Sequence, residues 1–196
     1  MSRVARQNFA EFDPAAPQFV ERAFQTLYDH WSELRVASGL PQAKSLSPRA
    51  LAPHLHNMVI QEVHSPLEVR YRLVGTSVVA RMGVDPTGQN LLDYVADQMH
   101  QAASLLFQFV SGHPCGALTS HLNIAGNGRA MNILSLYLPL AVAEGEVPRV
   151  VSIHAQEEIV NYLPPSGQVK IGSALNGHAW IDLGFGQPAI SAAAVT

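Results

Sequence analysis

The sequence predicts an α+β fold: a five-stranded antiparallel sheet with helices on one face, an N-terminal helix before it and a C-terminal extension after it. Two alternating apolar segments, 56–63 and 69–74, are joined by a turn so short that they must pair antiparallel. Two longer segments, 117–124 and 130–140, flank an Asn-Gly pair that is typical of a tight hairpin. Between these two pairs of strands, residues 97–111 have the apolar spacing of a helix.

The composition is that of one globular domain with extensions. The chain has 196 residues, of which 47% are hydrophobic and 14% charged. A net charge of −3 offers no positive surface for nucleic acid, and no apolar run is long enough to cross a bilayer. The single cysteine excludes an intrachain disulfide and a multi-cysteine metal site. Because the N-terminus lacks the apolar core of a signal peptide, we expect a cytoplasmic protein without a membrane partner.

The N-terminal part divides into a polar arm and a helix. Residues 1–17 contain two prolines and are expected to form a flexible arm, and residues 18–46 a helix with its linker, the helical signal running to residue 38. Apolar residues at alternating spacings of four and three form one stripe on this helix: Val20, Phe24, Leu27, Trp31 and Leu34. The stripe either packs onto the sheet of its own chain or forms a homodimer contact.

The segment 69–95 holds a strand, a turn and two short helical pieces. Val69, Tyr71 and Leu73 alternate with arginines, which is the pattern of a half-buried strand. Gly75 ends the strand, and Thr76 is expected to be the N-cap of a short helix over residues 77–82.

The remaining elements complete the predicted domain at residues 47–156. Residues 149–155 read as the fifth strand, after the hairpin that follows the long helix. Residues 157–196 form a C-terminal extension with a linker rich in proline and glycine. Trp180 and Ile181 in this extension are expected to dock on the domain or on a partner chain.

Several of these segments resemble a PAS domain. The run RYRLVGT at 70–76, followed by GVDPTG at 83–88 and a short apolar helix, is similar to the strand–helix–loop unit of that fold. With the segment from Trp31 to Leu55, the chain resembles the small stand-alone PAS proteins of alphaproteobacteria along most of its length. The resemblance implies a sensory or signalling role, and pairing through the N-terminal helix. Because PAS domains sense very different signals, the ligand has to be argued from the site.

Histidines provide the alternatives for a metal or haem. His54 and His56 lie two residues apart, but no third ligand follows at a suitable spacing. Some PAS proteins bind haem through a histidine on the long helix, where this chain has His100. Met99 fits the apolar stripe of that helix better, so His100 is expected to face solvent and haem is a minority alternative.

Flavin binding and catalysis have less support. The stretch that corresponds to the reactive-cysteine motif of flavin-binding PAS photosensors, residues 88–98, contains no cysteine. Cys115 follows a helix, and its neighbour His113 is poorly placed to act as its base, so we expect a structural cysteine. No nucleophile elbow, phosphate-binding loop or zinc-protease motif occurs, and we expect no catalytic residues.

The function predicted from these observations is a cytoplasmic sensory PAS domain. It would bind a small apolar or amphipathic ligand, a signalling protein, or both, and it would not be an enzyme. We expect the ligand between the sheet and the long helix, lined by Tyr71, Leu73, Leu106, Leu134 and Leu136. The alternatives are a scaffold protein with a solid core, a haem-binding sensor, and an enzyme, which would need polar groups converging where the sequence places mostly leucine.

Overall fold

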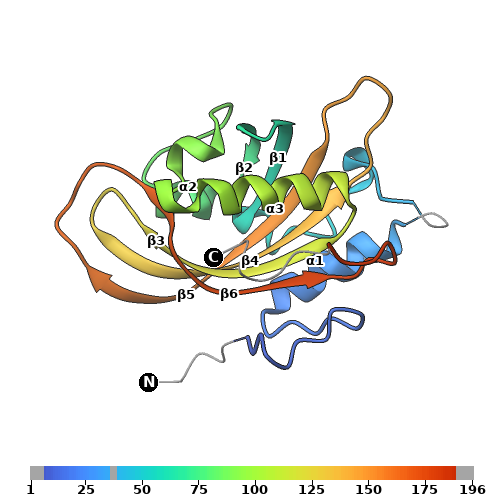
Figure 1. Ribbon diagram of the computed structural model, residues 1–196, viewed down its shortest axis with the longest axis horizontal. Coiled ribbons are helices and arrows are strands. Elements are labelled where there is room, and N and C mark those ends of the chain that lie inside the picture. The colour runs from blue at the N-terminus through green and yellow to red at the C-terminus, as the bar shows by residue number, and fades with distance from the viewer. Residues whose placement is uncertain (1–6, 36–38, 189–196) are drawn as a thin grey trace.

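The computed structural model describes residues 7–35 and 39–188, and it confirms the α+β fold (Figure 1). One antiparallel sheet has the strand order β2-β1-β5-β4-β3-β6. Its strands are β1 (Met58–Ser65), β2 (Glu68–Val74), β3 (Gly116–Ile124), β4 (Arg129–Leu140), β5 (Arg149–Tyr162) and β6 (Lys170–Ile181). The α-helices are α1 (Arg22–Glu33), α2 (Thr76–Met82) and α3 (His100–Gly112).

The sheet has six strands where the sequence predicted five. The sixth, β6, comes from the C-terminal extension and pairs antiparallel with β3. β5 also continues beyond the predicted residue 155 and pairs with β4 as far as Tyr162. Trp180 and Ile181 are buried at the end of β6, so they dock on their own domain as one of the two alternatives predicted.

Helices cover both faces of the sheet. α2 and α3 pack on one face of the sheet. Strand residues on that face, such as Ala117 and Tyr137, belong to the same apolar cluster as the residues of these two helices. α1 packs on the other face, against residues of opposite phase such as Leu118 and Leu136. Figure 1 shows α3 crossing the sheet on one side and α1 lying beyond its other side. The N-terminal helix therefore serves as the second cover of the sheet.

The apolar stripe of α1 is used within the chain. Phe24, Leu27 and Trp31 are buried against the sheet, and the Trp31 indole N–H donates to the Pro139 carbonyl at 2.8 Å. Val20, which precedes the helix, is 46% exposed. The predicted helix extended to residue 38, but α1 ends at Glu33, and residues 36–38 lie outside those described.

Part of the predicted N-terminal arm lies against the domain. The Phe9 ring packs on β6 at Gly177, where a Cβ atom would come within 2.5 Å of the ring. Phe12 packs at a tilt against Phe19, with ring centroids 6.0 Å apart and an interplanar angle of 45°. Residues 1–6 of this arm lie outside the described residues. The flexibility predicted for the arm stays a prediction.

The turn from β2 into α2 depends on a glycine. α2 begins at Thr76 with Gly75 as the N-cap, and no side chain caps it, so the prediction of Thr76 as N-cap was wrong. A Cβ atom on Gly75 would lie 2.4 Å from the His56 carbonyl oxygen, so the backbone approaches too closely for any side chain. This close approach brings α2 against the short 3-10 helix Leu55–Asn57, which precedes β1.

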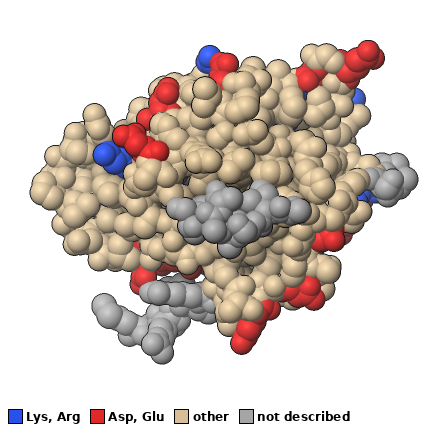
Figure 2. All heavy atoms as spheres, viewed as in Figure 1, with Lys and Arg blue, Asp and Glu red and all other residues tan. Residues whose placement is uncertain are grey.

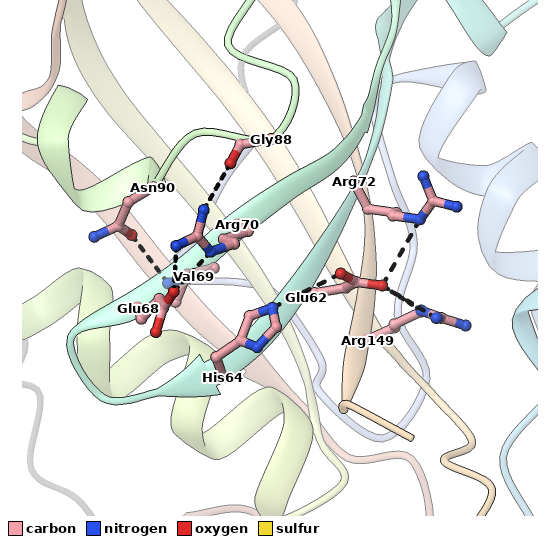
Figure 3. A network of polar contacts seen from close by, with 9 residues as sticks. All are labelled: Glu62, His64, Glu68, Val69, Arg70, Arg72, Gly88, Asn90 and Arg149. Atoms are coloured by element: carbon pink, nitrogen blue, oxygen red, sulfur yellow. Dashed lines mark hydrogen bonds and ion pairs between the residues drawn. The ribbon is translucent and has the colours of Figure 1, made fainter. Parts of the chain in front are cut away.

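The edge strand β2 is covered by the loop that follows α2 (Figure 3). The Gly88 amide donates to the Tyr71 carbonyl, and the Arg70 side chain donates to the Gly88 carbonyl at 3.0 Å. The Asn90 side chain accepts from the Val69 amide at 3.0 Å. These bonds satisfy backbone groups that an edge strand would otherwise expose.

Charged side chains are sparse over the face in Figure 2, and Lys and Arg do not gather into a patch there. None of the helices in the part of the chain that the structure describes has the length and apolarity to cross a membrane.

Candidate functional site

A cavity of about 120 Å³ lies between α2, α3 and the sheet. We name it the α3 cavity. Much of its wall is apolar, because α2, α3, the segment before α3 and the strands present aliphatic and aromatic side chains to it. These apolar residues include Val59, Val78, Met82, Leu91, Val95, Leu106, Phe107, Met131 and Ile133. A volume of this size holds more than single water molecules, so the site suits a small organic ligand.

The C-terminal extension completes one wall of the α3 cavity. Val169, Ile171 and Leu175 line it. The Ala96 amide donates to the Ile171 carbonyl at 2.9 Å, which ties this wall to the segment before α3. The extension is therefore part of the site as well as part of the sheet.

Polar side chains of the central strands form a band across the floor of the cavity. Gln61 donates to the Ser152 hydroxyl at 2.8 Å, and that hydroxyl lies 2.9 Å from His154 Nε2. His154 Nδ1 lies 2.8 Å from the Ser135 hydroxyl. Because Ser152 accepts from Gln61, its own hydrogen can go to His154 Nε2, which places the ring hydrogen on Nδ1. We name this group the polar band: Gln61, Thr119, His121, Ser135, Tyr137, Ser152 and His154.

The band continues onto β3. The Thr119 hydroxyl lies 3.2 Å from His121 Nδ1. The Tyr137 ring packs edge-on to the His154 ring with centroids 5.8 Å apart. The Gln61 side-chain oxygen is buried and has no hydrogen-bond partner among the described residues. Gln61 is among the residues that line the cavity, and an acceptor without a partner can take a hydrogen bond from a molecule bound beside it.

Burial keeps the ionisable groups of the polar band neutral. It lowers the pKa of His121 to about 4. Burial, followed by the charges of Arg81 and His121, lowers the pKa of His154 to about 3. Burial also raises the pKa values of Tyr71 and Tyr137. At neutral pH these groups are therefore uncharged donors and acceptors.

Two of the five predicted ligand-binding residues lie in this cavity. Tyr71 from β2 and Leu106 from α3 line it. Leu73 is 48% exposed and lies outside the lining. Leu134 and Leu136 are buried in the cluster beneath α1, on the opposite face of the sheet. The prediction that Leu73, Leu134 and Leu136 line the ligand site was therefore wrong.

Local geometry explains the misplacement of Leu73. β1 pairs Gln61 with Tyr71 but Ile60 with Leu73, so Arg72 is an extra residue in a β-bulge. A bulge shifts the alternation of side chains by one position. Leu73 consequently shares the face of Ile60 instead of the face of Tyr71.

The choice of face on β4 explains the other two misplacements. Leu134 and Leu136 alternate with Ile133, Ser135 and Tyr137, and the sequence reading assigned the leucine face to the ligand. In the structure α1 covers that face as a closed core. The more polar face borders the α3 cavity.

The histidines considered for metal or haem lie elsewhere. His54 and His56 flank Leu55 in a short 3-10 helix before β1 and do not line the α3 cavity. His100 is exposed, as expected, and its ring lies 3.0 Å from the Val95 carbonyl. Within residues 7–35 and 39–188 no group of three or more metal-ligating side chains occurs.

The lone cysteine is structural in its surroundings. Cys115 is buried at the start of β3 and is not among the residues that line the α3 cavity. Burial raises the pKa of its thiol to about 12, which removes the thiolate that a reactive cysteine needs.

The sequence reading missed the polar residues that matter most at this site, His121, His154 and Arg81. Thr119, His121 and Asn123 alternate along β3, as do Ser152 and His154 along β5. Polar residues at every second position of strands that are otherwise apolar were the available signal. Arg81 had no such signal, because one arginine in a short helix normally faces solvent.

Two solved structures resemble the fold at 15% sequence identity. A light-oxygen-voltage domain studied with a flavin analogue gives a TM-score of 0.44, covering 55% of this chain and 82% of that one. The light-state structure of the LOV domain of the blue-light photoreceptor Aureochrome1 gives 0.42, covering 55% and 86%. At this level of similarity neither structure bears on the ligand or cofactor of the present chain.

Comparison with curated proteins finds no match. Residues 20–155 match the family model described as a PAS domain. This range runs from the start of the α1 region into β5, so it includes both helical covers of the sheet and excludes β6. The sequence resemblance to PAS proteins is confirmed, and the chain belongs to the PAS-domain family, a sensory and signalling fold.

Proposed function

We propose that this PAS domain is a sensor that binds a small, mainly apolar molecule in the α3 cavity and catalyses no reaction. One observation carries the proposal: the apolar hollow has a polar floor on which the buried Gln61 oxygen has no partner among the described residues. Buried polar atoms are nearly always hydrogen-bonded, so a ligand with a donor group would complete this wall. The alternative of a scaffold with a solid core has less support, because the side chains leave this volume between them.

Enzymatic activity would need converging polar groups, and polar groups do converge in this cavity, contrary to the expectation of a leucine lining. The two buried histidines have pKa values of about 4 and about 3. A general base works best with a pKa near the working pH, and these rings are too weakly basic to accept a proton readily. Their nitrogens also bond to serine and threonine hydroxyls within the band. These features favour a role in recognition.

A sensor passes its signal to a partner, which would be a second copy of this chain or another signalling protein. Both the homodimer and the unidentified protein partner stay predictions. The residues that suggested a dimer through the N-terminal helix are largely buried within one chain. A dimer through this region would therefore use Val20 and the polar side of α1. Haem and flavin stay minority alternatives.

Native mass spectrometry of the full chain, freshly purified, tests ligand binding. We expect a mass excess that is lost on denaturation. Ala103→Leu would fill part of the α3 cavity and lower the occupancy, because Ala103 lines it. Ala80→Leu is the matched control on the exposed side of α2. An unliganded mass for the wild type, together with no stabilisation by any molecule of a small apolar library, would contradict the proposal.

A further inference from the structure

One charged side chain, that of Arg81, is among those that line the α3 cavity. Arg81 lies in the last turn of α2 and lines the cavity. Its guanidinium group donates to the Asn57 side chain at 2.7 Å and to the His154 carbonyl at 3.2 Å. A guanidinium has five N–H donors, so further donors remain without a partner among the described residues. The two bonds hold the group in a defined place at the edge of the polar band.

No carboxylate of the described residues lies within ion-pair distance of Arg81. Among the residues that line the α3 cavity it is the single Lys, Arg, Asp or Glu, and within the described residues it forms no ion pair with a carboxylate. Burial lowers its pKa, with no carboxylate acting in the opposite direction.

Three arginines outside the cavity, on β2 and β5, differ in this respect (Figure 3). Arg70 pairs with Glu68 at 2.6 Å, and Arg149 pairs with Glu62 at 3.1 Å. Arg72, which is more exposed, also lies 3.8 Å from Glu62. A partly buried positive charge without a partner is unfavourable, and an anion beside it would offset that cost.

The neighbouring histidines do not add to this charge. His121 and His154 are neutral at ordinary pH because both are buried. The positive charge in the cavity is therefore that of one guanidinium, which matches one carboxylate. Beyond Arg81 the wall under α3 is apolar, with Leu106, Phe107 and Ile133 facing the space.

We propose that the α3 cavity takes an amphipathic monocarboxylate, with its carboxylate on Arg81 and its apolar part beneath α3. This inference rests on the proposed function, since it names the ligand class for the same site. The unpartnered N–H donors of Arg81 provide charge-assisted hydrogen bonds to the carboxylate. The aliphatic wall accepts a straight alkyl chain or a single ring.

Titration calorimetry on the full chain tests this with straight-chain carboxylates from butyrate to decanoate, each matched to the alcohol and the amine of the same length. We expect the best carboxylate to bind roughly tenfold or more tightly than its alcohol, and the protonated amine to bind weakest. Arg81→Gln should abolish the preference for carboxylate over alcohol, and Arg81→Lys should restore part of it. Arg72→Gln, outside the cavity, is the matched control and should leave the preference unchanged.

The outcomes separate this inference from the proposed function. Equal binding of carboxylate and alcohol, or a carboxylate preference that survives Arg81→Gln, overturns the inference and leaves the sensor proposal in place. If no carboxylate binds, while native mass spectrometry shows a bound molecule without a carboxylate, the inference is likewise overturned and the sensor proposal stands. If nothing binds and nothing co-purifies, both proposals are overturned.

Discussion

The face of the sheet under α1 and the face under α3 are built from the same strands, yet their side chains differ in kind. Under α1, strand residues such as Leu118, Leu136 and Ile153 meet Phe24 and Trp31 in a closed apolar core. Under α3, the same strands present threonine, histidine and tyrosine around a cavity. The first face is packed without a hollow, whereas the second combines its own apolar cluster with a cavity and polar groups.

The largest effect should come from breaking the α1 face at Trp31. Trp31→Ala removes a fully buried ring and the donor to the Pro139 carbonyl, and we expect a loss of about 4 kcal/mol in unfolding free energy. Urea unfolding measures it. Trp31→Phe, which keeps most of the apolar contact, should cost less than Trp31→Ala, about 2 kcal/mol. Ligand binding by the folded fraction should not change, and a loss below about 1 kcal/mol for Trp31→Ala would contradict the packing described.

A matched pair of leucines compares the two faces directly. Leu136→Ala under α1 should cost about 3 kcal/mol, because the removal leaves a new void in a closed core. Leu106→Ala should cost less, about 2 kcal/mol, because Leu106 already borders a cavity and alanine favours the helix. Equilibrium unfolding of both variants measures the difference. Equal losses would show that the two faces are packed alike.

The sequence could predict most elements of this fold, because their patterns are local. Alternation identified β1 to β4, and the Asn-Gly pair predicted the hairpin between β3 and β4 that the pairing of Ile124 with Ala130 confirms. β6 was missed as a strand because Lys170–Ile181 contains glycines and polar residues without clear alternation. Its pairing with β3 is long-range, and only the folded arrangement brings the two together.

The residues of the candidate site were less predictable than the elements of the fold, because they depend on tertiary packing. Tyr71 and Leu106 follow from the inward phase of one strand and one helix. Leu134 and Leu136 required knowing which face α1 covers, and this depends on a segment more than a hundred residues away in the sequence. Leu73 required knowing of the bulge at Arg72. Local pattern thus indicates which residues share a face, but tertiary packing decides which face holds the cavity.

The polar face should be the more sensitive to acid. The folded-state pKa values of His121 and His154, about 4 and about 3, lie below the ordinary value of 6.5, so the unfolded chain binds protons first as the pH falls. The stability from the neutral rings is present above about pH 6.5 and declines below it, by about 1.4 kcal/mol per pH unit for each ring.

Variants assign this acid sensitivity to the polar band. His154→Gln, with unfolding free energy measured from about pH 7 to about pH 5, should reduce the slope by about one ring's share. Ala80→Leu, on the exposed side of α2, changes no ionisable group and should leave the slope unchanged. An unaltered slope in His154→Gln and in His121→Gln would show that these rings do not titrate differently on folding.

The smallest effect is expected at the end of the α1 stripe, where the two alternatives for the helix still differ. Val20 follows the stripe spacing but is 46% exposed, so Val20→Ser should change the unfolding free energy of a monomer by less than about 0.5 kcal/mol. If the homodimer predicted for this region forms, the same change removes an apolar contact from its interface and weakens association. Light scattering across a concentration series, with Glu33→Gln at the other end of α1 as the control, measures this. A wild-type chain that stays monomeric at high micromolar concentration would remove the dimer and leave α1 as a cover of the sheet alone.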